Sequence, residues 1–253
     1  MVSSYNLHHG EEPPISGSRG SGTIFFTNCI LRCVYCQNYP ISQLGVGKVY
    51  THRDLADMML YLQRKGAHNI NFVTPTHFVP SILKALVIAV ERGFRLPLVY
   101  NTSGYERAET LKILDGIVDI YLPDIKYSSD LMAKKYSKAK DYVRYNREAL
   151  KEMFRQVGPL RLNREGVAVR GLLIRHLVLP NDIAGSEESL RFIARELSPE
   201  VPISLMSQYF PAYRAKDIRE LSRPILPEEY ERVLELMERF GLRRGWIQEH
   251  FLL

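Results

Sequence analysis

Cysteine is scarce in this chain of 253 residues: there are three copies, and all fall in one short stretch, at Cys29, Cys33 and Cys36. Proteins held together by a disulfide framework usually carry an even number of cysteines and belong to secreted or extracellular compartments. A small, odd number in one place argues against such a framework and indicates another use for the thiols.

Long hydrophobic runs are also missing. No run of about 18 apolar residues occurs, so we expect no transmembrane helix. Residues 1–14 lack the basic and then apolar pattern of a secretory signal peptide. No repeat, linker or low-complexity tract divides the chain. These absences predict a cytoplasmic protein that binds no membrane.

What is present is the composition of an ordinary globular protein, with 45% hydrophobic and 25% charged residues. The net charge is +6, but Lys and Arg are spread over predicted helix faces. The densest basic cluster, residues 239–246, suits a solvated helix end, where cations are favourable. We therefore expect no nucleic-acid binding, and we expect a monomer.

Strand-like and helix-like segments alternate from residue 23 onward. The strand-like runs are 23–28, 69–73, 97–101, 118–126, 171–180 and 202–209. The helical patterns are 54–66, 80–93, 106–116, 129–157, 186–197 and 227–241. Six alternations predict an α/β fold with a parallel sheet and helices outside it.

A complete eightfold barrel usually takes about 250 residues, and this chain spends many residues elsewhere. We therefore predict an open (β/α)6 partial TIM barrel, with a flat doubly wound sheet as the alternative. In both folds ligands bind at the C-terminal ends of the strands.

The chain is predicted to have three parts. Residues 1–22 are rich in Gly, Pro and Ser without periodicity and form a loop-rich N-terminal arm. Residues 23–210 form the core, and residues 211–253 form a C-terminal helical extension packed on it. Asp54 is expected to be the N-cap of the first long helix. The arm carries two histidines and two glutamates, either as a second metal site or as a solvated arm: His8, His9, Glu11 and Glu12.

The spacing Cys29-x3-Cys33-x2-Cys36 follows the first predicted strand directly. Zinc usually takes four protein ligands, or three and a water at a catalytic site, and the only nearby histidine, His52, stands alone. Thiolates also hold iron–sulfur clusters. Three thiolates can bind three irons of a 4Fe–4S cube and leave the fourth iron open. We favour one such cluster over zinc.

The stretch CILRCVYCQN at 29–38 resembles the cluster loop of the radical S-adenosylmethionine (SAM) superfamily. Within it, the loop is most similar to that of the pyruvate formate-lyase activating enzymes, which activate glycyl-radical enzymes. Four further stretches resemble uncharacterised activase-like iron–sulfur proteins: HHGEEPPISG (8–17), GSGTIFF (20–26), NFVTPTHFVP (71–80) and MSQYFPAY (206–213).

The resemblance implies a radical SAM enzyme. Its 4Fe–4S cluster would bind SAM at the open iron and cleave it reductively to a 5′-deoxyadenosyl radical that abstracts hydrogen from a substrate. It implies a glycyl-radical protein partner and a flavodoxin- or ferredoxin-type reductant. A small molecule or another peptide remains an alternative target. A weaker alternative is a non-enzymatic electron-transfer or zinc-binding module.

The resemblance also places SAM contacts at the strand ends, where three stretches depart from the activase pattern. Residues 73–78 lack the activase glutamate, Asn101 stands in place of an aspartate, and Gln208 lies near the position of a histidine. Asp124 and Lys126 have the spacing of one strand face, as SAM contacts or as a mutual ion pair. The candidate contacts are Tyr35, Gln37, Thr74, Thr76, His77, Asn101, Ser103, Asp124, Lys126, Arg175 and Gln208.

Structural roles remain open for several of these residues. Tyr35 fits the role of a core aromatic equally well. In the same way, His77 fits a histidine that is bonded within its loop, and Asn101 fits a residue that forms a turn. His176 lies on the strand face opposite Arg175, so we expect it to be structural.

Overall fold

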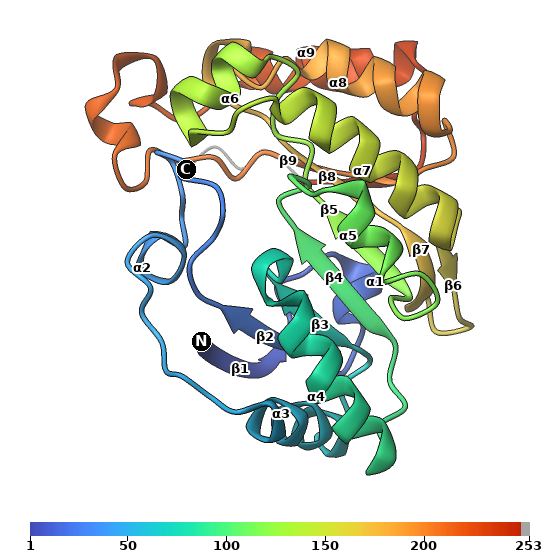
Figure 1. The fold of residues 1–253 in the computed structure, drawn as a ribbon. Coiled ribbons are helices and arrows are strands. Elements are labelled where there is room, and N and C mark those ends of the chain that lie inside the picture. The colour runs from blue at the N-terminus through green and yellow to red at the C-terminus, as the bar shows by residue number, and fades with distance from the viewer. Residues whose placement is uncertain (249–253) are drawn as a thin grey trace.

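The computed structural model describes residues 1–248 (Figure 1). Its strands are β1 Val2–His8, β2 Ser21–Phe26, β3 Ile70–Val73, β4 Leu98–Thr102, β5 Ile120–Pro123, β6 Arg161–Leu162, β7 Ala168–Leu172, β8 Ile174–Leu177, β9 Ile203–Met206 and β10 Gly245–Ile247. Its α-helices are α1 Pro13–Ser16, α2 Tyr39–Ser42, α3 His52–Arg64, α4 Val79–Glu91, α5 Ala108–Lys112, α6 Asp130–Ser137, α7 Tyr142–Val157, α8 Ser186–Phe192 and α9 Pro227–Arg239.

The strands form one seven-stranded sheet, in the order β1–β2–β3–β4–β5–β7–β6, and one three-stranded sheet, in the order β8–β9–β10. The neighbours from β2 to β5, β5 and β7, and β8 to β10 pair in parallel. The two sheets meet at Asp124 and Arg175, which form a parallel bridge. In Figure 1 the strands curve from β1 round to β9, with α3 and α4 along one part and α7 to α9 along another. The predicted α/β fold, an open partial barrel, is confirmed.

All six predicted core strands are present, in the predicted order. The fifth, expected as one strand over 171–180, is split into β7 and β8 at Leu173. The reason is a change of partner: Leu173 N donates to Tyr121 O of β5 at 3.0 Å, whereas Ile174 N donates to Pro202 O beside β9 at 3.1 Å. The strand therefore passes from one sheet to the other at this residue.

The N-terminal residues are not the loop-rich arm that we predicted. Val2–His8 forms β1, which pairs antiparallel with β2, and the pairing of His8 with Ser21 brings the chain to the N-terminal ends of the parallel strands. Backbone pairing with a strand edge decides the structure here, although the side chains show no strong alternation. Residues 9–20, including α1, then lie across that end of the barrel.

The C-terminal extension also differs in part from its prediction. The expected helix over 227–241 is present as Pro227–Arg239. The next segment was expected to be a helix end, but Gly245–Ile247 forms β10, parallel to β9. Gly245 has a φ of 134°, and a Cβ there would lie 1.9 Å from the Ile203 carbonyl oxygen, so only glycine permits this pairing. The last part of the extension, residues 249–253, lies outside the described residues.

The two faces of the sheet have different cores. The outer face packs against helices: Ile24 and Phe72 contact the α3–α4 layer, and Tyr121 belongs to the cluster that includes α7 and α9. The inner face carries a smaller apolar cluster to which α1 contributes Ile15. Its buried members are Ile15, Val99, Ile120, Leu122, Ala168 and Leu173. The N-terminal segment is therefore part of the core.

The N-cap of helix α3 lies three residues before Asp54, the N-cap that we predicted. This N-cap is Thr51, whose hydroxyl accepts from Asp54 N at 3.1 Å, while the Asp54 carboxylate accepts from Thr51 N at 2.8 Å. This reciprocal capping box uses Asp54 at the third helical position and satisfies two backbone donors.

Within residues 1–248, none of the helices is both long enough and apolar enough to cross a membrane.

The role of the N-terminal segment in the core gives a stability prediction. Ile15 is fully buried, so Ile15→Ala should lower the free energy of unfolding by about 2–5 kcal/mol in urea denaturation. Val87→Ala, at a position on α4 that is 60% exposed, should change it by less than about 0.5 kcal/mol. Equal effects of the two changes would show that residues 9–20 do not belong to the core.

Candidate active site

The three cysteines lie in the loop between β2 and α2, at the C-terminal end of β2. Cys33 is buried, and Cys29 and Cys36 are partly exposed. Burial raises the pKa of Cys29 to about 12 and raises the pKa of Cys33; the charges of Cys33 and Cys36 add to the shift of Cys29, and that of Cys36 adds to the shift of Cys33. The three sulfurs therefore lie close enough to interact, and Cys29 and Cys33 stay protonated until a positive group binds them.

Backbone hydrogen bonds fix the shape of this loop. Arg32 N donates to Ser137 O at 2.9 Å, and Val34 N donates to Tyr136 O at 2.8 Å. Both acceptors lie at the end of α6. The predicted helical insertion at 129–157 thus supports the cysteine loop through its first helix.

A chain of buried hydroxyls leads to one of the sulfurs. The hydroxyls of Tyr35 and Tyr127 lie 2.7 Å apart, and those of Tyr127 and Ser137 also lie 2.7 Å apart. Ser137 Oγ donates to Cys33 Sγ at 3.0 Å. Tyr35 is only 5% exposed and packs edge-on against Tyr209, which fits the alternative of a core aromatic.

Three charged side chains meet where β5 has just ended and β8 begins. Asp124 Oδ2 lies 2.6 Å from Lys126 Nζ, and Asp124 Oδ1 accepts from Arg175 Nε at 2.8 Å. Burial alone would raise the pKa of Asp124, but Arg175 and Lys126 outweigh it and hold this pKa below its usual value. Neither Asp124 nor Lys126 lies on a strand face, because β5 ends at Pro123, but the alternative of a mutual ion pair is formed.

The N-terminal segment adds a fourth charge to this cluster. The Glu11 carboxylate accepts from Asn71 Nδ2 at 2.9 Å and lies 3.4 Å from Asn101 Nδ2 and 3.5 Å from Arg175 Nη1. Arg175 Nη2 donates to Asn101 Oδ1 at 2.6 Å. Polar groups from β3, β4 and β8 and from the segment after β1 therefore converge inside the barrel.

The suggested second metal site around His8, His9, Glu11 and Glu12 is not formed. In the described part of the chain, no three His, Cys, Asp or Glu side chains converge as ligands of one metal ion. The Glu11 carboxylate is turned toward Asn71 and Arg175 instead, because the segment after β1 enters the barrel.

The turn after β3 lies beside the turn after β4. Thr74 has a positive φ of 61°, and Thr74 N donates to Asn101 O at 2.9 Å. Thr76 Oγ1 donates to Glu106 at 2.6 Å. Ser103 contributes its carbonyl oxygen, which accepts from Tyr142 OH at 3.3 Å. Thr74, Thr76 and Asn101 are thus close together, while the recorded contact of Ser103 is a backbone one.

The two histidines singled out from the sequence have structural contacts. His77 Nε2 lies 3.1 Å from Thr27 O, so this histidine ties the turn after β3 to the end of β2 and is not bonded within its own loop. His176 is fully buried, between Ile125 O at 2.7 Å and Ser186 Oγ at 2.9 Å. Burial lowers the pKa of His176 to about 4, so it is neutral and structural.

The cysteine loop is also linked to the end of β9. Gln37 Nε2 donates to Gln208 O at 2.9 Å, and the Gln208 side chain lies 3.5 Å from Gln248 Nε2. These two candidate residues, far apart in the sequence, are therefore neighbours.

Glu106, which was not among the residues predicted from the sequence, is one of the most unusual groups in this region. It is 3% exposed, and its Oε1 accepts from Thr102 at 2.5 Å, from Thr76 at 2.6 Å and from Tyr100 at 3.3 Å. Burial raises its pKa to about 7, although the three hydroxyls oppose the shift. The only signal in the sequence was its position directly after the candidate turn 100–105.

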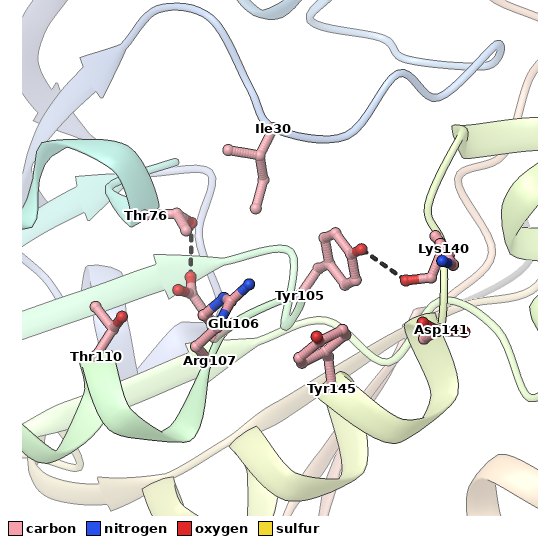
Figure 2. A pocket seen from close by; sticks show the side chains of 9 residues that line it. All are labelled: Ile30, Thr76, Tyr105, Glu106, Arg107, Thr110, Lys140, Asp141 and Tyr145. Atoms are coloured by element: carbon pink, nitrogen blue, oxygen red, sulfur yellow. Dashed lines mark hydrogen bonds between the residues drawn. The ribbon is translucent and has the colours of Figure 1, made fainter.

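Glu106 also lines a cavity of about 400 Å³. Figure 2 shows this cavity between the cysteine loop, the turns after β3 and β4, and the connection from α6 to α7. It is lined by Ile30, Thr76, Tyr105, Glu106, Arg107, Thr110, Lys140, Asp141 and Tyr145.

The chain matches one protein-family profile and the sequences of two known proteins. A family profile described as the Radical SAM superfamily matches residues 23–159. An uncharacterized protein of Methanocaldococcus jannaschii is 32% identical over 249 residues, which cover 93% of this chain and 66% of the relative. A second uncharacterized protein of the same organism is 26% identical over 224 residues, with 86% and 59% covered. The chain thus spans less than two thirds of the length of these relatives.

Two solved structures share the fold at low sequence identity. Methylornithine synthase is 14% identical with a TM-score of 0.54, over 88% of this chain and 63% of that protein. A maturase of the FeFe-hydrogenase is 10% identical with a TM-score of 0.51, over 87% and 48%. These similarities concern the fold alone.

The charge cluster predicts a large stability effect. Asp124→Asn leaves Lys126 and Arg175 buried without their counter-charge and should lower the free energy of unfolding by about 3–5 kcal/mol. Asp115→Asn is the control, since Asp115 forms an ion pair with Arg155 and its carboxylate is 44% exposed. This change should lower the free energy of unfolding by less than about 1 kcal/mol.

The same variant should change how stability depends on pH. A carboxyl with a lowered pKa stabilises the folded state above its unfolded pKa, near 3.9, and loses this contribution as the pH falls through its folded value. The difference in the free energy of unfolding between the wild type and Asp124→Asn should therefore become smaller as the pH falls. A difference that stays constant down to acid unfolding would contradict the ionised state of Asp124.

Proposed function

The chain belongs to the radical SAM superfamily, whose members typically use a 4Fe–4S cluster and SAM, and we propose that it is an enzyme that binds both. The observation that carries the proposal is the cysteine loop: Cys29, Cys33 and Cys36 lie together at the C-terminal end of β2, beside the charged cluster of Asp124 and Lys126. When bound, the cluster and SAM supply the 5′-deoxyadenosyl radical that removes hydrogen from a substrate.

The thiols fit a cluster better than a single zinc ion. In a cubane each thiolate binds its own iron, so the three sulfurs need not converge on one point. Within residues 1–248 no such convergence occurs. Because burial raises the pKa of Cys29 to about 12, its thiolate form needs nearby positive charge, which bound iron would provide. The zinc-binding alternative is therefore the weaker one.

Charged side chains beside the loop suit the zwitterionic end of SAM. Lys126 and Arg175 can pair with its carboxylate. Asn101 Oδ1 and the Glu11 carboxylate are acceptors for its ammonium group. Arg175 is already acted on by the carboxylates of Asp124, Glu12 and Glu11, and a ligand with one charge of each sign adds no net charge to this interior.

The remaining candidates frame this site. Gln37 and Gln208, joined by their hydrogen bond, lie on the β9 side, where their amides can meet a heterocycle. Thr74 and Thr76 lie on the β3 side, where the turn offers carbonyl oxygens and a hydroxyl. We assign His77 the role of holding that turn against Thr27.

We propose a glycine of a partner protein as the target of the radical, with a flavodoxin- or ferredoxin-type protein as the reductant. The support is the similarity of the strand-end stretches to those of the glycyl-radical activases. The position of residues 9–20 at the N-terminal end of the barrel agrees with it, since this segment does not cover the cysteine loop.

A small molecule is the second candidate target. The cavity of about 400 Å³ beside Ile30 favours it, because a space of this size suits a small ligand close to the cysteine loop.

Anaerobic reconstitution tests the cluster assignment. The wild-type chain should bind about four irons and, once reduced and given SAM, form 5′-deoxyadenosine. Cys33→Ser should bind less iron and form none, whereas Ser4→Ala, at an exposed position on β1, should behave as the wild type. A fully loaded wild-type cluster that yields no 5′-deoxyadenosine would overturn the proposed function.

Binding of SAM tests the charged cluster. Lys126→Met removes one charged contact to the SAM carboxylate and should weaken SAM binding by about tenfold to a hundredfold. Lys84→Met, at an exposed position on α4, is the matched control and should bind SAM as the wild type does. Equal affinities in equilibrium titration would exclude Lys126 from the SAM site.

A further inference from the structure

The cavity beside the cysteine loop contains an unsatisfied group. Glu106 Oε2 is buried and has no hydrogen-bond partner within the described chain. The other carboxylate oxygen, Oε1, already accepts from three hydroxyls, and this arrangement favours the ionised form. A buried carboxylate oxygen without a donor is costly, so a donor from outside the chain would be stabilised there.

The remaining wall of the cavity is aromatic and apolar. The rings of Tyr105 and Tyr145 meet edge to face, with their centroids 5.7 Å apart. Tyr105 OH donates to Lys140 O at 2.6 Å, which fixes this wall to the connection between α6 and α7 (Figure 2). Ile30 closes the side toward the cysteine loop. Tyr105, Tyr145 and Ile30 thus give the cavity an apolar side next to the Glu106 carboxylate.

Positive charge collects at the exposed part of the cavity. Arg107 and Lys140 are both exposed, and within residues 1–248 neither forms an ion pair. The guanidinium of Arg107 lies 5.9 Å from the Tyr145 ring centroid. Asp141 is the one acidic residue of the lining besides Glu106. The cavity thus has an anionic inner group and a cationic rim.

We propose that this cavity binds a small zwitterion of the amino-acid type, with a primary ammonium group at Glu106 Oε2 and a carboxylate at Arg107 and Lys140. The ammonium group supplies the donor that Glu106 lacks, and the rim pairs with the opposite charge. The role of this ligand as the hydrogen donor of the radical reaction rests on the proposed function. The binding of the ligand in the cavity does not rest on that function.

Calorimetric titration of the reconstituted full-length protein tests the inference without turnover. The probes are 6-aminohexanoate, which has both charges, hexanoate, which lacks the ammonium group, and hexylamine, which lacks the carboxylate. The zwitterion should bind at least about tenfold more tightly than either of the other two. No binding of 6-aminohexanoate, or equal binding of hexanoate, would overturn the proposal.

Two variants identify the inner group. Glu106→Gln keeps an acceptor for the three hydroxyls but removes the charge, so it should weaken the binding of 6-aminohexanoate at least about tenfold. Glu152→Gln changes a buried carboxylate outside the cavity and should have no effect on binding. Thermal unfolding of both variants shows that they are folded. A folded Glu106→Gln protein with wild-type affinity would overturn the assignment.

The pH dependence of binding gives an independent readout. Tyr100 and Tyr121 face Glu106, and burial raises the pKa of each, so both stay neutral around neutral pH. Between about pH 6 and about pH 8 Glu106 loses its proton, so the wild type should bind 6-aminohexanoate more tightly as the pH rises. Glu106→Gln should lack this dependence, and the same slope in both proteins would contradict the role of Glu106.

The test of ligand binding and the test of the proposed function can fail independently of each other. Formation of 5′-deoxyadenosine without binding of 6-aminohexanoate would overturn this inference alone. Binding of 6-aminohexanoate without 5′-deoxyadenosine would support the inference and overturn the proposed function.

Discussion

The carboxylate of Asp124 is the interaction on which this architecture depends. Its two oxygens bind Lys126, from the segment after β5, and Arg175, from β8. The backbones of Asp124 and Arg175 are bridged at the same place, which is where the two sheets join. The contact that closes the curve of the sheet therefore also fixes the charges of the candidate active site.

The cysteine loop is supported from the same region. The charge of Lys126 opposes the effect of burial on the pKa of Cys33. The hydroxyl chain through Tyr127 and Ser137 reaches the Cys33 sulfur, and the end of α6 binds the loop backbone. The helical insertion and the strand ends thus position the thiols before any cluster binds, which lowers the cost of assembling the site.

Much of the fold could be predicted because its signals are local. Apolar periodicity and Gly or Pro at the ends of segments indicated six strands and their helices, and the cysteine spacing placed the candidate cluster loop. The strand β1 could not be predicted, since it forms by pairing with β2 and has little alternation of its own. The split at Leu173 depends on a change of pairing partner, which no local pattern records.

The candidate site was predictable where its residues follow a predicted strand, as Asp124 and Lys126 do, or lie on one, as Arg175 does. Glu11 and Glu106 were not, because their importance comes from burial and from partners distant in the sequence. Glu11 reaches Arg175 across 164 positions, and Glu106 joins the turns after β3 and β4. Residue type and spacing carry no information about such contacts.

The most direct test of the central claim is pulsed electron paramagnetic resonance of the reduced, cluster-loaded protein with SAM isotopically labelled at its amino nitrogen. If three thiolates leave one iron open beside Lys126 and Arg175, the label should show a hyperfine coupling to the cluster. A reduced 4Fe–4S cluster whose spectrum is unchanged by SAM and shows no coupling to the label would contradict the account.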